Sequence, residues 1–155
     1  MTRFQIVRLS LVRFATSFLV VLLVGVLNRI MIAELGIGRT LVGAILSLLH
    51  LATPLALYFG FLSDNSIITG FRRTPFILLG MACCCLPVPF LPDLARAISD
   101  SPEPALLILL MVALLLITGF GIAVSTIALH ALLVDRCPEK QRGEAMTLIW
   151  IITLT

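Results

Sequence analysis

Three long stretches without a charged side chain constrain this sequence more than any other feature. Residues 40–63, 74–92 and 104–134 contain no Asp, Glu, Lys or Arg, and a helix needs roughly 20 apolar residues to cross the hydrocarbon core of a bilayer. A fourth stretch, residues 14–33, has a similar length, although Asn28 and Arg29 interrupt it near one end. None of these stretches alternates as the strands of a membrane barrel do. The sequence therefore predicts an all-α transmembrane protein.

The composition excludes an ordinary soluble domain. Charged residues make up 12% of the chain, against about 25% in a typical globular protein, and the mean hydropathy is +1.16. The sequence contains no Ser-His-Asp arrangement, phosphate-binding glycine loop or dinucleotide fingerprint. Cys83, Cys84 and Cys85 are consecutive, so on a helix they point in different directions and form no shared metal site. We expect a membrane protein without enzymatic activity, resident metal ion or nucleic-acid partner, whose net charge of +3 reflects topology.

Four full spans and the beginning of a fifth are expected. The predicted helices cover residues 12–33, 40–62, 75–90, 104–134 and, incompletely, 145–155. Pro87 and Pro89 should distort the outer end of the third helix, and residues 91–104 should form the outer connection. Residues 146–155 rise only about 15 Å, half the bilayer, and a helix ending there would leave carbonyl groups unsatisfied in lipid. Residues 1–155 are thus predicted to form a partial N-terminal bundle, which further chain or neighbouring subunits complete.

The positively charged residues predict a cytoplasmic N-terminus, because cytoplasmic loops are enriched in Lys and Arg. With this orientation Arg29, Arg39 and Arg96 lie on the outer side, and the other eight basic residues lie on the inner side. The opposite orientation would reverse the bias. No cleavage site follows the first apolar stretch, so we expect this stretch to be retained as a helix. The inner residues are Arg3, Arg8, Arg13, Arg72, Arg73, Arg136, Lys140 and Arg142.

Two charged inner segments resemble signature loops of the major facilitator superfamily. The stretch GFLSDNSIITGFRR resembles the motif between helices 2 and 3 of that superfamily, with Gly60, Asp64, Gly70, Arg72 and Arg73 at motif positions. The resemblance implies the N-terminal part of a major-facilitator-type bundle. It also implies a conformational latch, in which Asp64 faces a helix N-terminus of the opposite bundle and pairs with Arg73. The competing interpretation is that these charges only determine topology. The second segment resembles the loop between helices 4 and 5 at Asp135, Pro138, Arg142 and Gly143.

Three further runs resemble a narrower branch, the PucC/LhaA-type (bacterio)chlorophyll delivery family. These runs are GVLNRIMIAELG at residues 25–36, FGFLSD at residues 59–64 and GFRRTPFILLG at residues 70–80. The resemblance covers nearly the whole chain but about the first third of a family member. It implies chlorophyll or bacteriochlorophyll as the bound pigment, and antenna or photosystem polypeptides as partners beside membrane lipid. The implied location is a bacterial inner, intracytoplasmic or thylakoid membrane.

Four residues are candidates for a pigment or cavity site. His50 lies in the middle of the second span, and its neutral imidazole can ligate the magnesium of a chlorin or hydrogen-bond to a neighbouring helix. It shares a small and polar stripe with other residues of that helix, and such a face normally looks into a bundle. His130 is a second candidate, nearer the inner surface. Asn28 and Arg29 either shape a cavity or lie at the outer interface, where Arg29 can extend to the headgroups. The stripe consists of Gly43, Ser47, His50, Pro54 and Tyr58.

The preferred functional hypothesis is a membrane protein that handles (bacterio)chlorophyll, for delivery to or assembly of light-harvesting and photosystem complexes. One alternative is a proton-coupled small-molecule transporter of the same superfamily. Residues 118–123, TGFGIA, resemble a helix 4 motif of many proton-coupled members, but Leu115 stands where that motif has arginine. No charged residue lies in the middle of the second, third or fourth helix, whereas proton-driven transport usually needs a titratable relay there. A second alternative is a structural accessory subunit of a pigment–protein complex.

Overall fold

The computed structural model describes residues 3–51, 54, 58, 61, 73–101, 104–137 and 139–154, and within these residues every regular element is a helix. The predicted all-α class is therefore confirmed. The helices are α1 (Arg3–Arg29), the π-helix η1 (Ile30–Glu34), α2 (Arg39–Leu51), α4 (Thr74–Cys85), α5 (Phe90–Asp100), α6 (Ala105–Arg136) and α7 (Glu139–Leu154).

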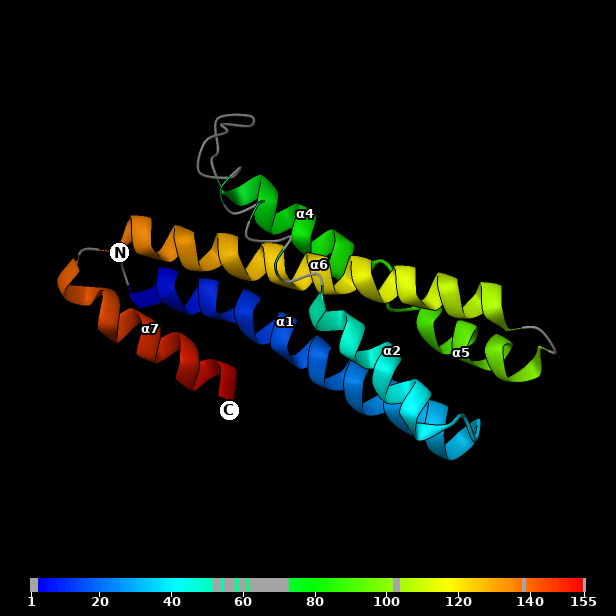
Figure 1. Ribbon diagram of the computed structural model, residues 1–155. Coiled ribbons are helices and arrows are strands. Elements are labelled where there is room, and N and C mark those ends of the chain that lie inside the picture. The colour runs from blue at the N-terminus through cyan, green and yellow to red at the C-terminus, as the bar shows by residue number, and fades with distance from the viewer. Residues whose placement is uncertain are drawn as a thin grey trace.

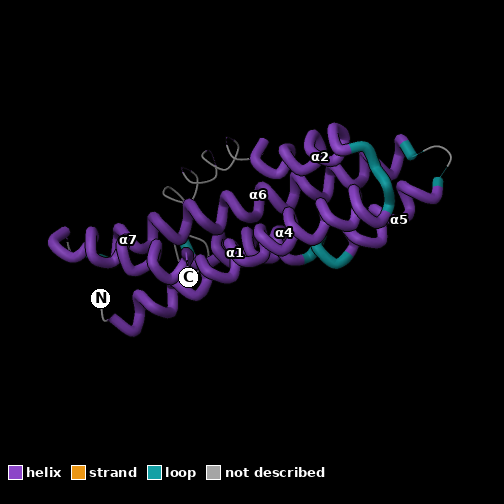
Figure 2. Tube along the Cα trace, turned by 90° about the horizontal axis from the view of Figure 1, so that it is seen from below, coloured by secondary structure: helices purple, strands orange, loops and turns teal. Residues whose placement is uncertain are grey.

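The helices run along one common long axis, and the longest of them, α6, lies at the centre (Figures 1 and 2). The helices α4, α2 and α5 pack along α6, while α7 packs against the first half of α1. The N-terminus, the beginning of α4 and the end of α6 lie at one end of the bundle, and the turn between η1 and α2 lies at the other end (Figure 1).

Three helical segments are long and apolar enough to cross a membrane: Leu9–Glu34, Thr74–Asp100 and Ala105–Arg136. At about 1.5 Å per residue, the 32 residues of α6 extend about 48 Å, more than the bilayer core. The helix α2 is described for only 13 residues; the remainder of the predicted second span lies mostly outside the described residues. The chain is a multi-pass membrane protein, and the expected total of four full spans stays a prediction.

The first and last helices begin earlier than the sequence analysis predicted. The first helix starts at Arg3 rather than near residue 12, because residues 3–24 contain neither glycine nor proline and three arginines do not interrupt helical backbone. The last helix starts at Glu139 rather than at residue 145. In the sequence Pro138 directly precedes it, and proline is well tolerated where a helix begins. Gly143 is therefore part of a helix, where a loop was expected.

The predicted outer connection contains an amphipathic helix, α5, that the sequence analysis did not predict. The helix α4 ends at Cys85, and Pro87 and Pro89 separate it from α5, where the Phe90 N–H donates to the Pro87 carbonyl at 3.1 Å. The predicted distortion by these prolines is confirmed. The apolar face of α5 packs on the core through Leu91, Leu94, Ala95 and Ile98. This spacing of three and four residues is that of a surface helix.

Glycine residues allow the central helices to approach closely. A Cβ atom on Gly119 of α6 would overlap the carbonyl oxygen of Leu49 on α2. A Cβ atom on Gly121 would lie 2.5 Å from the carbonyl oxygen of Gly80 and 2.6 Å from the backbone nitrogen of Cys84, both on α4. Small residues at such contacts are the usual way in which membrane helices pack. The TGFGIA stretch therefore serves as the contact surface of α6 for two different neighbours.

Candidate functional site

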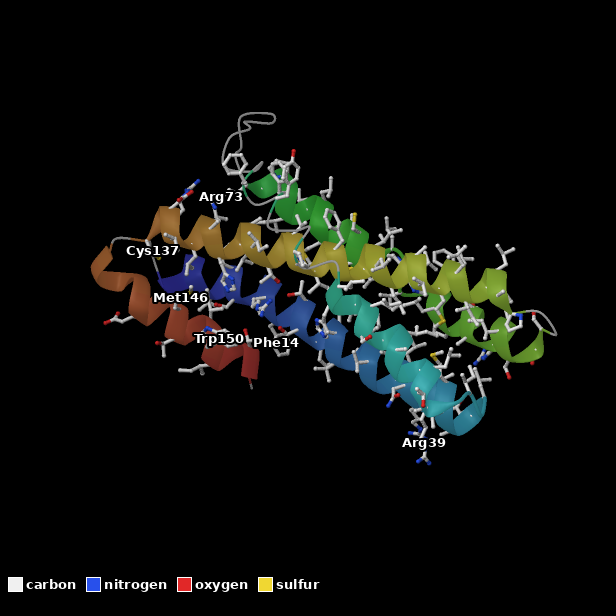
Figure 3. All side chains as sticks on the ribbon, in the orientation of Figure 1. Phe14, Arg39, Arg73, Cys137, Met146 and Trp150 are labelled. Atoms are coloured by element: carbon white, nitrogen blue, oxygen red, sulfur yellow. The ribbon has the colours of Figure 1, made fainter. Side chains whose placement is uncertain are left out.

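An ion pair joins the two charged segments. Its Arg73 lies toward the end of the bundle where the N-terminus lies (Figure 3). Arg73 immediately precedes α4, and its Nε lies 2.8 Å from Oδ2 of Asp135 in the last turn of α6. The Nε–H is not aligned for a hydrogen bond, so this contact is an ion pair. The Arg73 side chain is 12% exposed and Asp135 is 52% exposed. The pair therefore links the beginning of α4 to the end of α6 in a partly solvated setting.

Most other residues of the predicted latch lie outside the part of the chain that the structure describes. Gly60, Asp64, Gly70 and Arg72 lie outside the described residues, and so does the implied pairing of Asp64 with Arg73. Gly143 is exposed in the second turn of α7, and a Cβ added to it would meet nothing within 4 Å. Arg142 belongs to the same helix. Of the two motifs, only Arg73 and Asp135 are brought together within the described part of the chain.

A polar pocket lies where α1, α2 and α6 meet. Its volume is about 220 Å³, and its polar lining comes from Arg13 on α1, His50 on α2 and Thr126 on α6. The Nη1 of Arg13 donates a hydrogen bond of 2.7 Å to Oγ1 of Thr126. His130 lies one helical turn beyond Thr126 and close enough to Arg13 for their charges to interact. The remaining lining of the pocket is apolar apart from Gly119.

The stripe predicted to look into the bundle is exposed in this structure. All five of its residues, Gly43, Ser47, His50, Pro54 and Tyr58, are exposed. The opposite face of α2 is buried through Val42, Ile45 and Leu49 and packs in the apolar core. Within the described residues, branched apolar side chains rather than this stripe make the helix contacts of α2, and the orientation expected of the stripe stays a prediction. His50 still borders the polar pocket from the edge of the stripe.

The run LNRIMIAELG forms the reversal between α1 and α2. Its centre is the π-helix η1, in which the Leu35 N–H donates to the Ile30 carbonyl at 3.0 Å. Gly36 follows with a φ of 65°, and Ile37 closes the turn by donating to the Met31 carbonyl at 2.9 Å. A positive φ favours glycine at such a helix end. Met31 is fully buried in the apolar core.

Asn28 and Arg29 are both exposed just before this turn, and neither lines the polar pocket or the apolar groove described below.

An apolar groove runs along α1. Its volume is about 550 Å³, and its walls come from α1 and Ile30 of η1, from Val88 between α4 and α5, and from the first turn of α5. Nearly all of the lining is hydrocarbon, including the rings of Phe14 and Phe18, whose centroids are 6.0 Å apart in a stacked arrangement. Both rings are exposed, at 38% and 54%. Grooves of this size accommodate ligands of several hundred Å³. Other residues of the wall are Leu22, Val26, Leu91 and Pro92.

Comparison with known protein families decides what kind of membrane protein this is. The chain matches the family model described as PUCC protein over residues 26–155. This chain belongs to the PucC family. The match includes the π-turn, the ion pair and most of the helical bundle, so the resemblance to the PucC/LhaA-type family is confirmed, while the resemblance to the major facilitator superfamily stays a prediction. No solved structure matches the chain.

Similar curated proteins come from Rhodobacter capsulatus, Rhodovulum sulfidophilum and Cereibacter sphaeroides. The PucC-family chain is 35% identical over 97% of its length to the bacteriochlorophyll synthase 44.5 kDa chain of Rhodobacter capsulatus, of which it covers 34%. It is 31% identical over 97% of its length to protein PucC of Rhodovulum sulfidophilum, of which it also covers 34%. It is 43% identical over 49% of its length to protein PucC of Cereibacter sphaeroides, of which it covers 17%. The chain thus spans about a third of the length of the two relatives that match nearly all of it.

Two features of this PucC-family chain were missed in the sequence. The sequence predicts Arg13 among the inner charges beside a first helix that begins at about residue 12, whereas the structure places it ten residues into α1. The stretch from residue 3 to residue 24, which contains no glycine or proline, is the sequence signal for this earlier start. No pattern in the sequence predicted the apolar groove, because its walls combine α1 with residues near the break between α4 and α5, more than 60 residues later in the sequence.

Within the described residues, no group of three His, Cys, Asp or Glu side chains could hold a metal ion.

Proposed function

We propose that this chain handles (bacterio)chlorophyll in a photosynthetic membrane, for delivery to or assembly of light-harvesting and photosystem complexes. Membership of the PucC family carries the proposal. The name of one relative, the bacteriochlorophyll synthase 44.5 kDa chain, supports a pigment as the molecule concerned. Antenna or photosystem polypeptides are the proposed partners, together with membrane lipid. The chain binds and positions the pigment in this proposal and catalyses no reaction.

The apolar groove is the proposed pigment surface. A chlorin ester is a flat, largely apolar ligand, and the groove offers two stacked aromatic rings and aliphatic side chains along one helix. Burial of apolar surface against such walls contributes about 25 cal/mol per Å² to binding in water; in lipid the gain comes instead from shape and from contacts between the rings. An open groove on α1 lets pigment move sideways between the bilayer and a receiving polypeptide.

His50 remains the proposed magnesium ligand. Its side chain is exposed, and within the described residues no hydrogen bond to it is formed. A neutral imidazole with an accessible nitrogen fits a magnesium ion that has one open axial position. The apolar groove lies on α1, whereas His50 lies on α2 beside the polar pocket. Pigment loss in a His50→Gln variant would therefore report a contact separate from the groove.

The test is pigment retention by a variant that fills the groove. Ala15 is exposed and lines the groove, so Ala15→Phe adds a ring there without a clash in the core. Protein purified in mild detergent from a phototrophic host should carry chlorin absorbance, and Ala15→Phe should lower the chlorin-to-protein ratio at least severalfold. The matched control is Ala113→Phe, which adds the same ring at an exposed position of α6 outside the groove.

Three outcomes separate the alternatives. Absence of chlorin from the purified protein, together with normal antenna assembly in a deletion strain, overturns the pigment-handling proposal. Recovery of antenna or photosystem polypeptides in substoichiometric amounts supports delivery or assembly. Recovery in a fixed stoichiometric ratio would instead indicate a structural accessory subunit.

The ion pair between Arg73 and Asp135 favours a second candidate function, a proton-coupled transporter of the major facilitator type. This contact joins, within one bundle, the two charged segments that resemble signature loops of that superfamily. Substrate accumulation driven by a pH gradient in proteoliposomes, lost in Asp135→Asn and without any effect on pigment proteins, would support transport. Unchanged accumulation with the gradient collapsed would remove this candidate.

A further inference from the structure

Arg13 lies in the first apolar helical segment, Leu9–Glu34, four residues after its start, or about 6 Å along the axis. Its hydrogen-bond partner Thr126 precedes Asp135, in the last turn of α6, by nine residues or about 13 Å. The contact with Thr126 directs the guanidinium toward α6. A charged side chain within an apolar membrane helix typically faces the bundle interior or a water-filled cavity and marks a functional site.

Within the described residues no carboxylate neutralises Arg13. The ion pairs found there are Arg73 with Asp135 and Arg96 with Asp93, both remote from the pocket. Thr126 accepts one hydrogen bond, but a hydroxyl carries no charge, so the electrostatic cost of the guanidinium is not offset. The side chain is only partly buried and lines a pocket, so its remaining donors can be reached from the pocket.

The pocket around Arg13 has the chemistry of a small anion site with apolar walls. One fixed positive charge, a hydroxyl and an imidazole provide its polar groups, while Val20, Leu49 and Ile127 provide hydrocarbon. A volume of about 220 Å³ holds a carboxylate with several attached carbons but not a complete tetrapyrrole. A single guanidinium matches one negative charge, and its planar fork matches the two oxygens of a carboxylate. A phosphate dianion would retain uncompensated charge in this setting.

We propose that Arg13, with Thr126, binds the carboxylate group of an apolar ligand. The identity of that ligand rests on the function proposed above and goes beyond it: beside the esterified pigment proposed for the apolar groove, this site takes a chlorin that carries a free propionic acid side chain. Arg13 then distinguishes the free acid from an ester, because an ester offers neither the charge nor the second equivalent oxygen. The carboxylate, held in the polar pocket, would orient the rest of the molecule toward the helices that surround it.

The test compares acid and ester binding by the purified protein in lipid nanodiscs at pH 8, where carboxylic acids are ionised. The probes are a magnesium-free chlorin monocarboxylic acid and its methyl ester, measured by fluorescence quenching. The wild type should bind the acid at least about tenfold more tightly than the ester, since hydrogen bonds between charged groups are among the stronger ones in proteins. Arg13→Gln should remove the preference, and Arg13→Lys should keep part of it. Thr126→Val should weaken it severalfold.

The control is Arg39→Gln, which removes an exposed arginine at the other end of the bundle (Figure 3) and should leave the preference unchanged. Ester affinity equal to that of the wild type shows that a variant remains folded. Equal affinity of the wild type for acid and ester overturns the proposal, and so does an unchanged preference in Arg13→Gln.

A second pair of probes separates this site from the pigment function. If neither chlorin binds, the pigment-handling proposal fails, and lauric acid with methyl laurate then decides the carboxylate site. A wild-type preference for lauric acid that Arg13→Gln removes supports the site; its absence overturns it.

Discussion

At the scale of single residues, two arginines that look alike in the sequence have different surroundings. Arg13 and Arg73 both belong to the inner positive charges that predict topology. Arg73 pairs with Asp135 at the end of the bundle, whereas Arg13 donates to Thr126 about 13 Å further in. The difference arises from the length of α1, which extends nine residues beyond the predicted start. Residue type alone therefore does not separate a topology determinant from a bundle-facing cation.

Arg73 and Asp135 should be energetically coupled. In a double-mutant cycle with Arg73→Gln and Asp135→Asn, the two residues should show a coupling free energy of about 0.5–1 kcal/mol. The value is modest because Asp135 is half-exposed and solvent screens the pair, although Arg73 is 12% exposed. The measurement is the free energy of unfolding in mixed detergent micelles. Asp93 and Arg96, 3.8 Å apart and largely exposed, provide a control pair that should show no measurable coupling. Equal coupling in both cycles would contradict a special role for the Arg73 contact.

The candidate site could be predicted in part at this scale. His50 and Asp135 were named from the sequence, and the structure places His50 in the lining of the pocket that contains Arg13, and Asp135 in an ion pair with Arg73. Asn28 and Arg29 were named too, but they lie exposed beside the π-turn, which backbone hydrogen bonds hold together. Which side of α2 would be buried could not be predicted, because a small polar stripe and a branched apolar stripe both support helix packing in lipid.

At the scale of elements, the order of the helices followed from the apolar stretches, while their ends depended on local chemistry. Proline correctly predicted the break after α4. The helix α5 was not predicted because Asp93 and Arg96 interrupt its apolar residues, and such a mixture is typical of a polar connection. On a helix, the two charged residues lie on one face and the apolar residues on the other. Its buried face depends on contacts with the apolar core, and such tertiary contacts are not contained in a short sequence window.

The glycines of α6 should be the least tolerant positions of the helical bundle. Gly119→Ala should destabilise the protein by about 1–3 kcal/mol or more, because its new Cβ meets the backbone of Leu49, which cannot rotate away. Gly121→Ala should act similarly against α4. Gly43→Ala on α2 is the control, since a Cβ there meets nothing within 4 Å and alanine favours helix by about 0.5–1 kcal/mol over glycine. The measurement is again the free energy of unfolding in micelles. A loss in Gly43→Ala as large as that in Gly119→Ala would show that flexibility, not close packing, explains these glycines.

At the scale of the whole molecule, the bundle places the predicted inner and outer features at opposite ends. Arg73 and Cys137 lie near one end and Arg39 lies near the other (Figure 3). This separation agrees with a chain that crosses the bilayer between each pair of charged segments. The structure contains no membrane, so the direction of crossing depends on the distribution of Lys and Arg, which favours the inner side at the N-terminal end.

Cysteine accessibility should therefore show a cytoplasmic N-terminal end. Gly38, in the turn before α2, and Gly143, in α7, are both exposed, and a Cβ at either position meets nothing within 4 Å. Each can be changed to cysteine in a background without the native residues Cys83, Cys84, Cys85 and Cys137. In spheroplasts, a membrane-impermeant maleimide should label Gly38→Cys at once and Gly143→Cys only after lysis. The reverse result would invert the topology, and labelling of both before lysis would show that the two ends of the bundle do not lie on opposite sides of the membrane.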